Sequence, residues 1–141
     1  MTASYAVQIA DQMAAQINAV TFGVPIVARR AYVVALNLRE LKTIQVSIVP
    51  KSVETTRFSR GEKLATIEID LAIQRTVQDT EEADALMILT DQVIDLFEFR
   101  DLDNDVATHI KTDRKFIYDS EGMETKKLFT SLTMLTYQLH P

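Results

Sequence analysis

The chain has 141 residues, enough for one domain that can bury a sizeable core without disulfides. It contains no cysteine and two histidines, His109 and His140, which excludes thiol nucleophiles, thiolate metal sites and a multi-histidine metal cage. Its three glycines are far apart, which argues against a phosphate-cradling loop. The formal charge of −5 disfavours DNA binding by the whole surface, and no stretch is long and apolar enough for a membrane span.

Apolar residues at helical spacing predict two helices. The first begins near the N-terminus, where Thr2 or Ser4 can cap it, and the break at residues 18–25 follows it. The second covers residues 80–99, with Asp79 or Thr80 as the cap. The apolar stripe of the first helix comprises Ala6, Ile9, Ala10, Met13, Ala14 and Ile17.

Alternating or β-rich segments predict four to five strands. The first covers residues 26–34, where the adjacent Arg29 and Arg30 must point to opposite faces, so that at least one meets solvent, a partner or a carboxylate. A short connection at residues 36–42 follows. The clearest alternation lies at residues 43–49 and 64–77. The polar segment between them, residues 50–63, is interpreted as a long loop.

Two further strands are expected near the C-terminus. Residues 107–118 predict a short strand around Phe116, Ile117 and Tyr118, and residues 128–139 predict a long one. The long strand has apolar side chains on both faces, so it is either central in the sheet or covered by a partner. Residues 1–141 are therefore predicted to form a single α+β domain, with two helices on one face of a mostly antiparallel sheet.

Acidic residues concentrate in one part of the chain. Residues 79–105 carry ten acidic groups and one basic group, whereas the rest carries ten acidic and fourteen basic groups. A solvated helix face is the simplest interpretation. A patch that repels a polyanion or docks a basic partner is the second. A metal site of Asp91 and Asp95 is the third, but it lacks convergent ligands.

The sequence lacks a recognisable catalytic arrangement, and we expect no cofactor and no enzymatic activity. His109 lies in a polar context without a nucleophile nearby and is interpreted as a surface histidine; His140 is next to the C-terminus. Glu68 and Asp70 are two residues apart on one strand face, which is more typical of a solvent or partner face of a sheet, with Arg75 or Lys63 as possible counter-charges. The composition therefore favours a binding or assembly role.

The order of several segments resembles the tail terminator, or tail completion, proteins of long-tailed bacteriophages. The likeness covers about residues 5–138, and residues 46–50 and 59–61 are its most distinctive parts. The segments are Thr21-Phe22, Ala28-Arg29-Arg30-Ala31-Tyr32, Leu38-Arg39-Glu40-Leu41, Val46-Ser47-Ile48-Val49-Pro50, Ser59-Arg60-Gly61, Ile67-Glu68-Ile69-Asp70-Leu71-Ala72-Ile73-Gln74, Glu82-Ala83-Asp84-Ala85-Leu86-Met87 and Leu132-Thr133-Met134-Leu135-Thr136-Tyr137.

The resemblance implies a structural virion protein that forms a closed ring, typically of six subunits, after assembly in the host cytoplasm. Such a ring sits on the head-proximal end of the tail tube, stops tube polymerisation and offers a surface to the head–tail connector protein. DNA passes through its centre without specific binding. Two alternatives stay open: a head-side neck or connector ring protein, and a small non-viral ligand-binding or enzymatic domain.

Two sets of residues are the expected contact sites of such a ring. Arg57, Phe58 and Arg60 in the segment 50–63 are expected to meet a neighbouring ring, because aromatic and arginine side chains commonly anchor interfaces. An acidic face toward the DNA, or alternatively on the outer wall, is expected from the second helix, and the runner-up acidic face is that of Glu68 and Asp70. The residues of the helical face are Glu81, Asp84, Asp91, Asp95 and Glu98.

Overall fold

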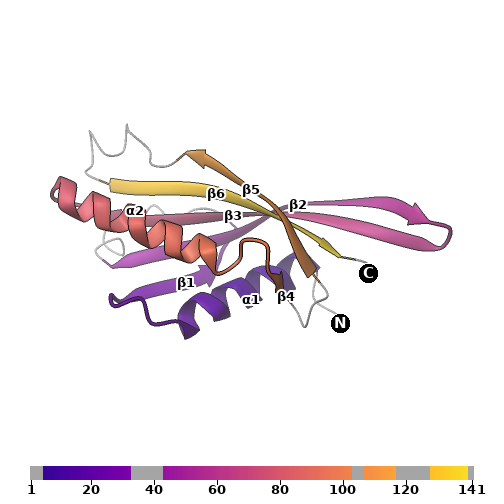
Figure 1. Ribbon diagram of the computed structural model, residues 1–141, viewed down its shortest axis with the longest axis horizontal. Helices are drawn as coiled ribbons and strands as arrows, with labels where there is room; N and C mark the ends of the chain where they lie inside the picture. Colours follow the sequence, from indigo (N-terminus) through magenta and orange to yellow (C-terminus); the bar gives the residue numbers. More distant parts are fainter. Residues whose placement is uncertain (1–4, 33–42, 103–106, 117–127, 140–141) are drawn as a thin grey trace.

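The computed structural model describes residues 5–32, 43–102, 107–116 and 128–139, which form two helices and six strands (Figure 1). The α+β class predicted from the sequence is confirmed. The elements are α1 (Tyr5–Ala19), β1 (Ile26–Arg30), β2 (Ile44–Ser59), β3 (Glu62–Thr76), α2 (Thr80–Asp95), β4 (Asp101–Leu102), β5 (Ala107–Phe116) and β6 (Leu128–Leu139).

The strands make one sheet in the order β1-β2-β3-β6-β5-β4. β1 runs parallel to β2, and the other neighbouring pairs are antiparallel, as the sequence predicted for most of the sheet. The two-residue β4 raises the strand number above the expected four to five. β6 lies between β3 and β5, so its apolar residues on both faces reflect a central position.

β3 separates its side chains into two sets with opposite surroundings. Ile67, Ile69, Leu71 and Ile73 are fully buried on one face, which we call the helix face. Glu68 and Asp70 alternate with them and lie half-buried on the other, which we call the outer face. The register pairs Ile67 with Tyr137 and Ile69 with Leu135 of β6, so the buried rows continue across the sheet.

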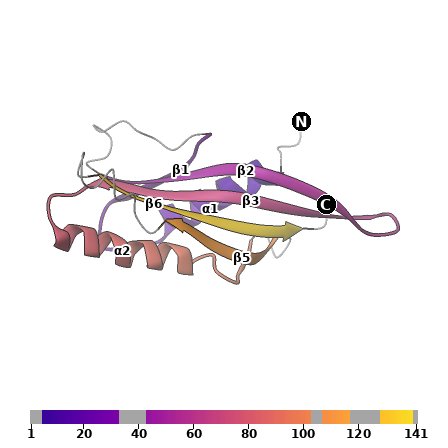
Figure 2. The ribbon, with the colours of Figure 1, turned by 90° about the horizontal axis from the view of Figure 1, so that it is seen from above.

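Both helices pack on the helix face. Met13 and Ile17 of α1 and Leu86 and Val93 of α2 belong to the same buried cluster as the apolar residues of that face. On this face α1 contacts mainly β1 and β2, whereas α2 lies nearer β6, and Figure 2 shows it running beside the strands. A single core between one layer of helices and one layer of strands therefore holds the domain together.

α2 begins and ends at clear signals. Asp79 is the N-cap: its carboxylate accepts a hydrogen bond of 2.8 Å from the Glu82 backbone N–H, and the Glu82 carboxylate accepts one of 2.8 Å from the Gln78 N–H. The helix ends at Asp95, four residues before the predicted end, and a turn continues to Phe99. Phe97 in this turn is still fully buried, which explains why the apolar stripe seemed longer than the helix.

The prediction of a loop at residues 50–63 is wrong. β2 continues to Ser59 and β3 begins at Glu62, so these residues form the distal half of a long β-hairpin, with Arg60 and Gly61 as its turn. The pairing with β3 is irregular between Pro50 and Ser52, where the strand carries a bulge. Exposed, polar strands lack the apolar alternation that identifies a strand, which is why the pattern indicated a loop.

Several sequence predictions fall outside the described residues. These are the helix caps Thr2 and Ser4, the end of the first strand at residues 33–34, the connection at 36–42, Ile117 and Tyr118 of the short strand, most of the acidic turn at 101–105, and His140. The described part of the short strand, β5, begins at Ala107 and is longer than expected.

Asn18, in the last turn of α1, covers the outer edge of β1. Its side-chain NH₂ donates to the Ala28 carbonyl at 2.9 Å, and its Oδ1 accepts from the Ala28 N–H at 3.0 Å. Arg30 on the same strand pairs with Asp11 of α1 at 2.8 Å, so this arginine meets a carboxylate, one of the three surroundings expected from the sequence. Together these contacts fix α1 against an edge strand whose outward-facing backbone groups have no strand partner among the described residues.

We expect Asn18→Ala to lower the free energy of unfolding by about 1–2 kcal/mol, because both Ala28 backbone groups lose their partner. Asn18→Asp should also destabilise, because a carboxylate cannot donate to the carbonyl. Urea denaturation followed by circular dichroism measures both changes. Gln16→Ala, on an exposed position of the same helix, is the control, and an Asn18→Ala variant as stable as this control would contradict the role of the amide.

Candidate assembly surfaces

The distal half of the β2–β3 hairpin, residues 51–63, forms an arm that projects from the body (Figure 1). The last β3 residue paired with β6 is Ala65, opposite Leu139, so the tip of the arm has only two strands. All side chains described in the arm are exposed. A two-stranded hairpin with both faces in water gains little from burial, so a partner surface would add substantially to its stability.

The arm is rich in cations. Lys51, Arg57, Arg60 and Lys63 outnumber Glu54 and Glu62. Arg57 lies directly opposite Lys63 in the strand register, and two like charges in this position repel each other. Neither Arg57 nor Arg60 forms an ion pair within the described part of the chain.

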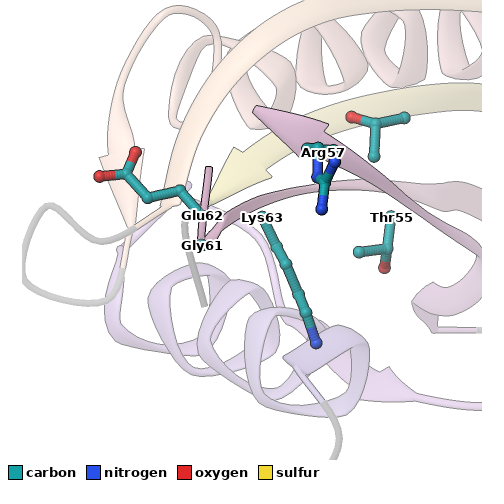
Figure 3. A pocket seen from close by; sticks show the side chains of 6 residues that line it. Thr55, Arg57, Gly61, Glu62 and Lys63 are labelled. Atoms are coloured by element: carbon teal, nitrogen blue, oxygen red, sulfur yellow. The ribbon is translucent and has the colours of Figure 1, made fainter. Parts of the chain in front are cut away.

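The arm also carries a hollow of about 310 Å³ next to these cations (Figure 3). Arg57 and Lys63 line it together with Thr55, Thr56, Gly61 and Glu62. Figure 3 shows Glu62 and Lys63 pointing in different directions from neighbouring positions of β3. Of the three contact residues predicted here, Arg57 and Arg60 are thus exposed on the arm, whereas the side chain of Phe58 lies outside the described part of the structure.

The exposed side of α2 carries a row of carboxylates. Glu81, Asp84, Asp91 and Asp95 are spaced three, seven and four residues apart, which places them on one stripe along the helix, and all four are exposed. Ile88, in the middle of the stripe, is 61% exposed. We call these five residues the acidic stripe. Glu98, the fifth predicted acid, follows the helix end and is half-buried.

Only one member of the acidic stripe forms an ion pair in the described part of the chain. Asp91 contacts Arg114 of β5 at 2.6 Å, and both side chains are partly exposed. Exposed ion pairs of this kind contribute little to stability. Glu81, Asp84 and Asp95 form no ion pair with any described residue, so most of the stripe presents negative charge to solvent.

The runner-up acidic face, that of Glu68 and Asp70, has mixed charge. Burial raises the pKa of Asp70, while Lys51 and Lys115 lower it, and Oδ1 of Asp70 is buried without a described hydrogen-bond partner. Lys115 pairs with Asp113 at 2.8 Å, which lowers the pKa of that carboxyl. The cations near Asp70 are thus Lys51 and Lys115. The sequence suggested Arg75 or Lys63 instead, but Arg75 lies on the helix face. A face with this balance repels DNA less than the acidic stripe does.

The prediction that His109 is a surface residue is wrong. His109 is 3% exposed, because the register places it beside Tyr137 on the helix face, with the two rings 5.4 Å apart. Its Nδ1 accepts a hydrogen bond of 2.8 Å from the Phe99 N–H, and its Nε2 lies 2.9 Å from Oγ1 of Thr112. This arrangement assigns the proton of the neutral ring to Nε2. The Phe99 side chain is 76% exposed, and its backbone adopts φ of 57°, a conformation that bulky residues rarely take.

No protein-family model matches this chain, and no curated protein matches its sequence. Within the described residues, no group of three or more potential metal ligands is present. The helices in the same part of the chain are too short or too polar to cross a membrane. The candidate functional sites are therefore the two charged surfaces, the arm and the acidic stripe.

Gly61→Ala should loosen the arm without unfolding the domain. Gly61 adopts φ of +84° in the hairpin turn, a conformation that costs about 1 kcal/mol or more for a residue with a side chain, although no atom lies within 4 Å of the added Cβ. Amide hydrogen exchange should rise in residues 56–64 and stay unchanged in β6. If the amides of the arm exchange equally fast in both proteins, the conformation of Gly61 does not determine the stability of the arm.

The stability of the protein should fall as the pH drops below about 6.5. Burial lowers the pKa of His109 below its ordinary value, although the nearby Glu98 opposes the shift, so the unfolded chain binds a proton more readily than the folded one. The stabilisation is complete above the unfolded pKa and is lost as the pH falls toward the folded pKa, by at most about 1.4 kcal/mol per pH unit. Urea denaturation between pH 7.5 and 5.5 measures this slope. His109→Gln should flatten it, and an unchanged slope in that variant would assign the effect to another group.

Proposed function

We propose that this protein is a ring-forming tail terminator of a long-tailed bacteriophage. In this role it caps the head-proximal end of the tail tube, stops tube growth and joins the tail to the head–tail connector. The observation that carries the proposal, beside the sequence resemblance, is the exposed arm. The tip of the arm has only two strands, and its cationic side chains are exposed. We expect such an element when contacts with a neighbouring molecule stabilise it.

The α+β body is compatible with this role. It supplies a rigid core of one helical layer and one sheet, from which the arm and the acidic stripe project to solvent. A subunit that offers two different surfaces can join a neighbour head to tail, and such contacts close into a ring when the rotation between neighbours permits it. A ring with a tube-like surface on one side only would end polymerisation there.

The two alternatives make different demands on the surface. A neck or connector ring protein would bind the head connector in preference to the tube end, so a binding comparison separates it from a terminator. A ligand-binding or enzymatic domain needs a pocket with convergent polar groups. The hollow of about 260 Å³ between α2 and the segment before β1 has mainly apolar lining, such as Phe22, Val24 and Ile88, and one charged residue, Arg75. It offers no acid–base pair within the described residues, which favours an assembly role.

The purified protein should form a closed ring, typically of six subunits, visible as a hollow particle in electron micrographs and as a single high-mass species in mass photometry. When it is added to polymerising tail tube protein, it should cap one tube end and fix the tube length. A protein that stays monomeric at every concentration and leaves tube growth unchanged would contradict the proposed function. Capture by the head connector without any effect on tubes would favour the neck protein.

A further inference from the structure

We propose that the arm of one subunit docks on the acidic stripe of a second copy of this chain. This inference rests on the proposed ring and specifies the contact that holds neighbours together. It makes Arg57, Arg60 and Lys63 one half of the interface, and Glu81, Asp84, Asp91 and Asp95, with Ile88 among them, the other half. The pairing is between different surfaces, so it is a head-to-tail contact.

The arm and the acidic stripe cannot meet within one subunit. Figures 1 and 2 show the arm and α2 at opposite ends of the molecule's long axis, and both views agree. β2 and β3 pair from the core to the tip of the arm, with register shifts after Pro50 and after Arg57, and this pairing holds the arm away from α2. A contact between the two surfaces must therefore join two molecules.

The charges of the two surfaces are complementary. Within the described part of the chain, Arg57 and Arg60 have no ion-pair partner, and the same is true of Glu81, Asp84 and Asp95. Residues 79–105 hold most of the excess negative charge of the chain, whereas the arm carries excess positive charge. Surfaces of opposite sign guide association and set the register of the partners.

The spacing of the charges also agrees. Arg57 and Lys63 lie directly opposite each other, and side chains in that position have Cβ atoms about 5 Å apart. Carboxylates three or four residues apart on a helix, such as Glu81 and Asp84, have Cβ atoms about 5–6 Å apart. Two neighbouring cations of the arm can therefore face two neighbouring acids of the stripe.

Apolar groups on both surfaces add contact area. Ile88 lies exposed between the acids of the stripe, and Val53, at the base of the arm, is 50% exposed. Ile88 has acids of the stripe on one side and the apolar hollow lined by Phe22 and Val24 on the other, and an exposed apolar side chain next to polar groups is typical of a small interface. The same contact accounts for the acidic stripe without placing it in the lumen of the ring, where it would repel DNA instead of joining subunits.

Charge reversal tests the proposal. The arm variant is Arg57→Glu with Arg60→Glu, and the stripe variant is Asp84→Lys with Asp95→Lys. Each variant alone should need an at least tenfold higher protein concentration to form rings. The arm variant turns the attraction at each contact into repulsion, and the stripe variant cancels the negative charge of the stripe, because Glu81 and Asp91 then face two lysines. Wild-type assembly should weaken between 50 and 500 mM NaCl, since salt screens exposed charges. Circular dichroism and thermal denaturation should show that both variants are folded.

The decisive measurement mixes the two defective variants in equal amounts. The negative arm of the first then meets a stripe that carries two added lysines, at positions 84 and 95, while the positive arm of the second meets the unchanged acidic stripe of the first. Rings of alternating subunits should therefore form from two proteins that do not assemble alone. Arg100→Glu with Lys111→Glu, which changes two exposed cations outside the arm, is the matched control and should assemble as the wild type does.

The remaining outcomes overturn the inference in distinguishable ways. If both variants form normal rings but fail to join tails, the arm contacts a neighbouring ring, and the proposed function stands without this interface. If the stripe variant forms normal rings that hold or eject DNA poorly, the stripe lines the lumen. If the variants lose assembly and their mixture does not recover, the two surfaces do not face each other. If the wild type itself never assembles or caps tubes, the proposed function fails.

Discussion

The two-sided pairing of β3 is the constraint on which the rest of the structure depends. β3 pairs with β2 along one edge and with β6 along the other, and its odd-numbered residues from Ala65 to Ile73 form the middle of the core. A shift of one residue would place Glu68 and Asp70 under the helices and expose the isoleucines. The cost of that exchange fixes the register of all three strands. It therefore also fixes where the hairpin leaves the body and which residues reach its tip.

The sequence predicted those helices and strands in which the buried apolar residues recur at a regular spacing. α1 and β3 have clear apolar patterns, and the structure gives them nearly the predicted bounds. The arm has no such pattern, because both of its faces are exposed and its backbone hydrogen bonds hold it together. His109 was misplaced for a different reason. Its sequence neighbours are polar, and the residue that buries it, Tyr137, is 28 positions away and becomes adjacent only through the β5–β6 register.

The candidate contact residues show the same limit. Arg57, Arg60 and the acids of α2 were identified from their residue types and local concentration, and the structure places them on exposed surfaces. Their position at opposite ends of the molecule depends on the length of the hairpin, which the sequence pattern did not indicate. The long hairpin places the cationic arm and the acids of α2 at opposite ends of one molecule. That arrangement suits a subunit with a neighbour on each side.

The bulge near Pro50 and the charges beyond it protect one edge of the sheet. β1 pairs with β2 only as far as Ile48, so the backbone of the following residues forms a sheet edge without a described strand partner. Such edges recruit strands from other molecules and seed aggregation. A proline, a bulge and alternating Lys51, Glu54 and Arg57 are the features that discourage this recruitment. These features therefore oppose the amyloid-like stacking of molecules along this edge.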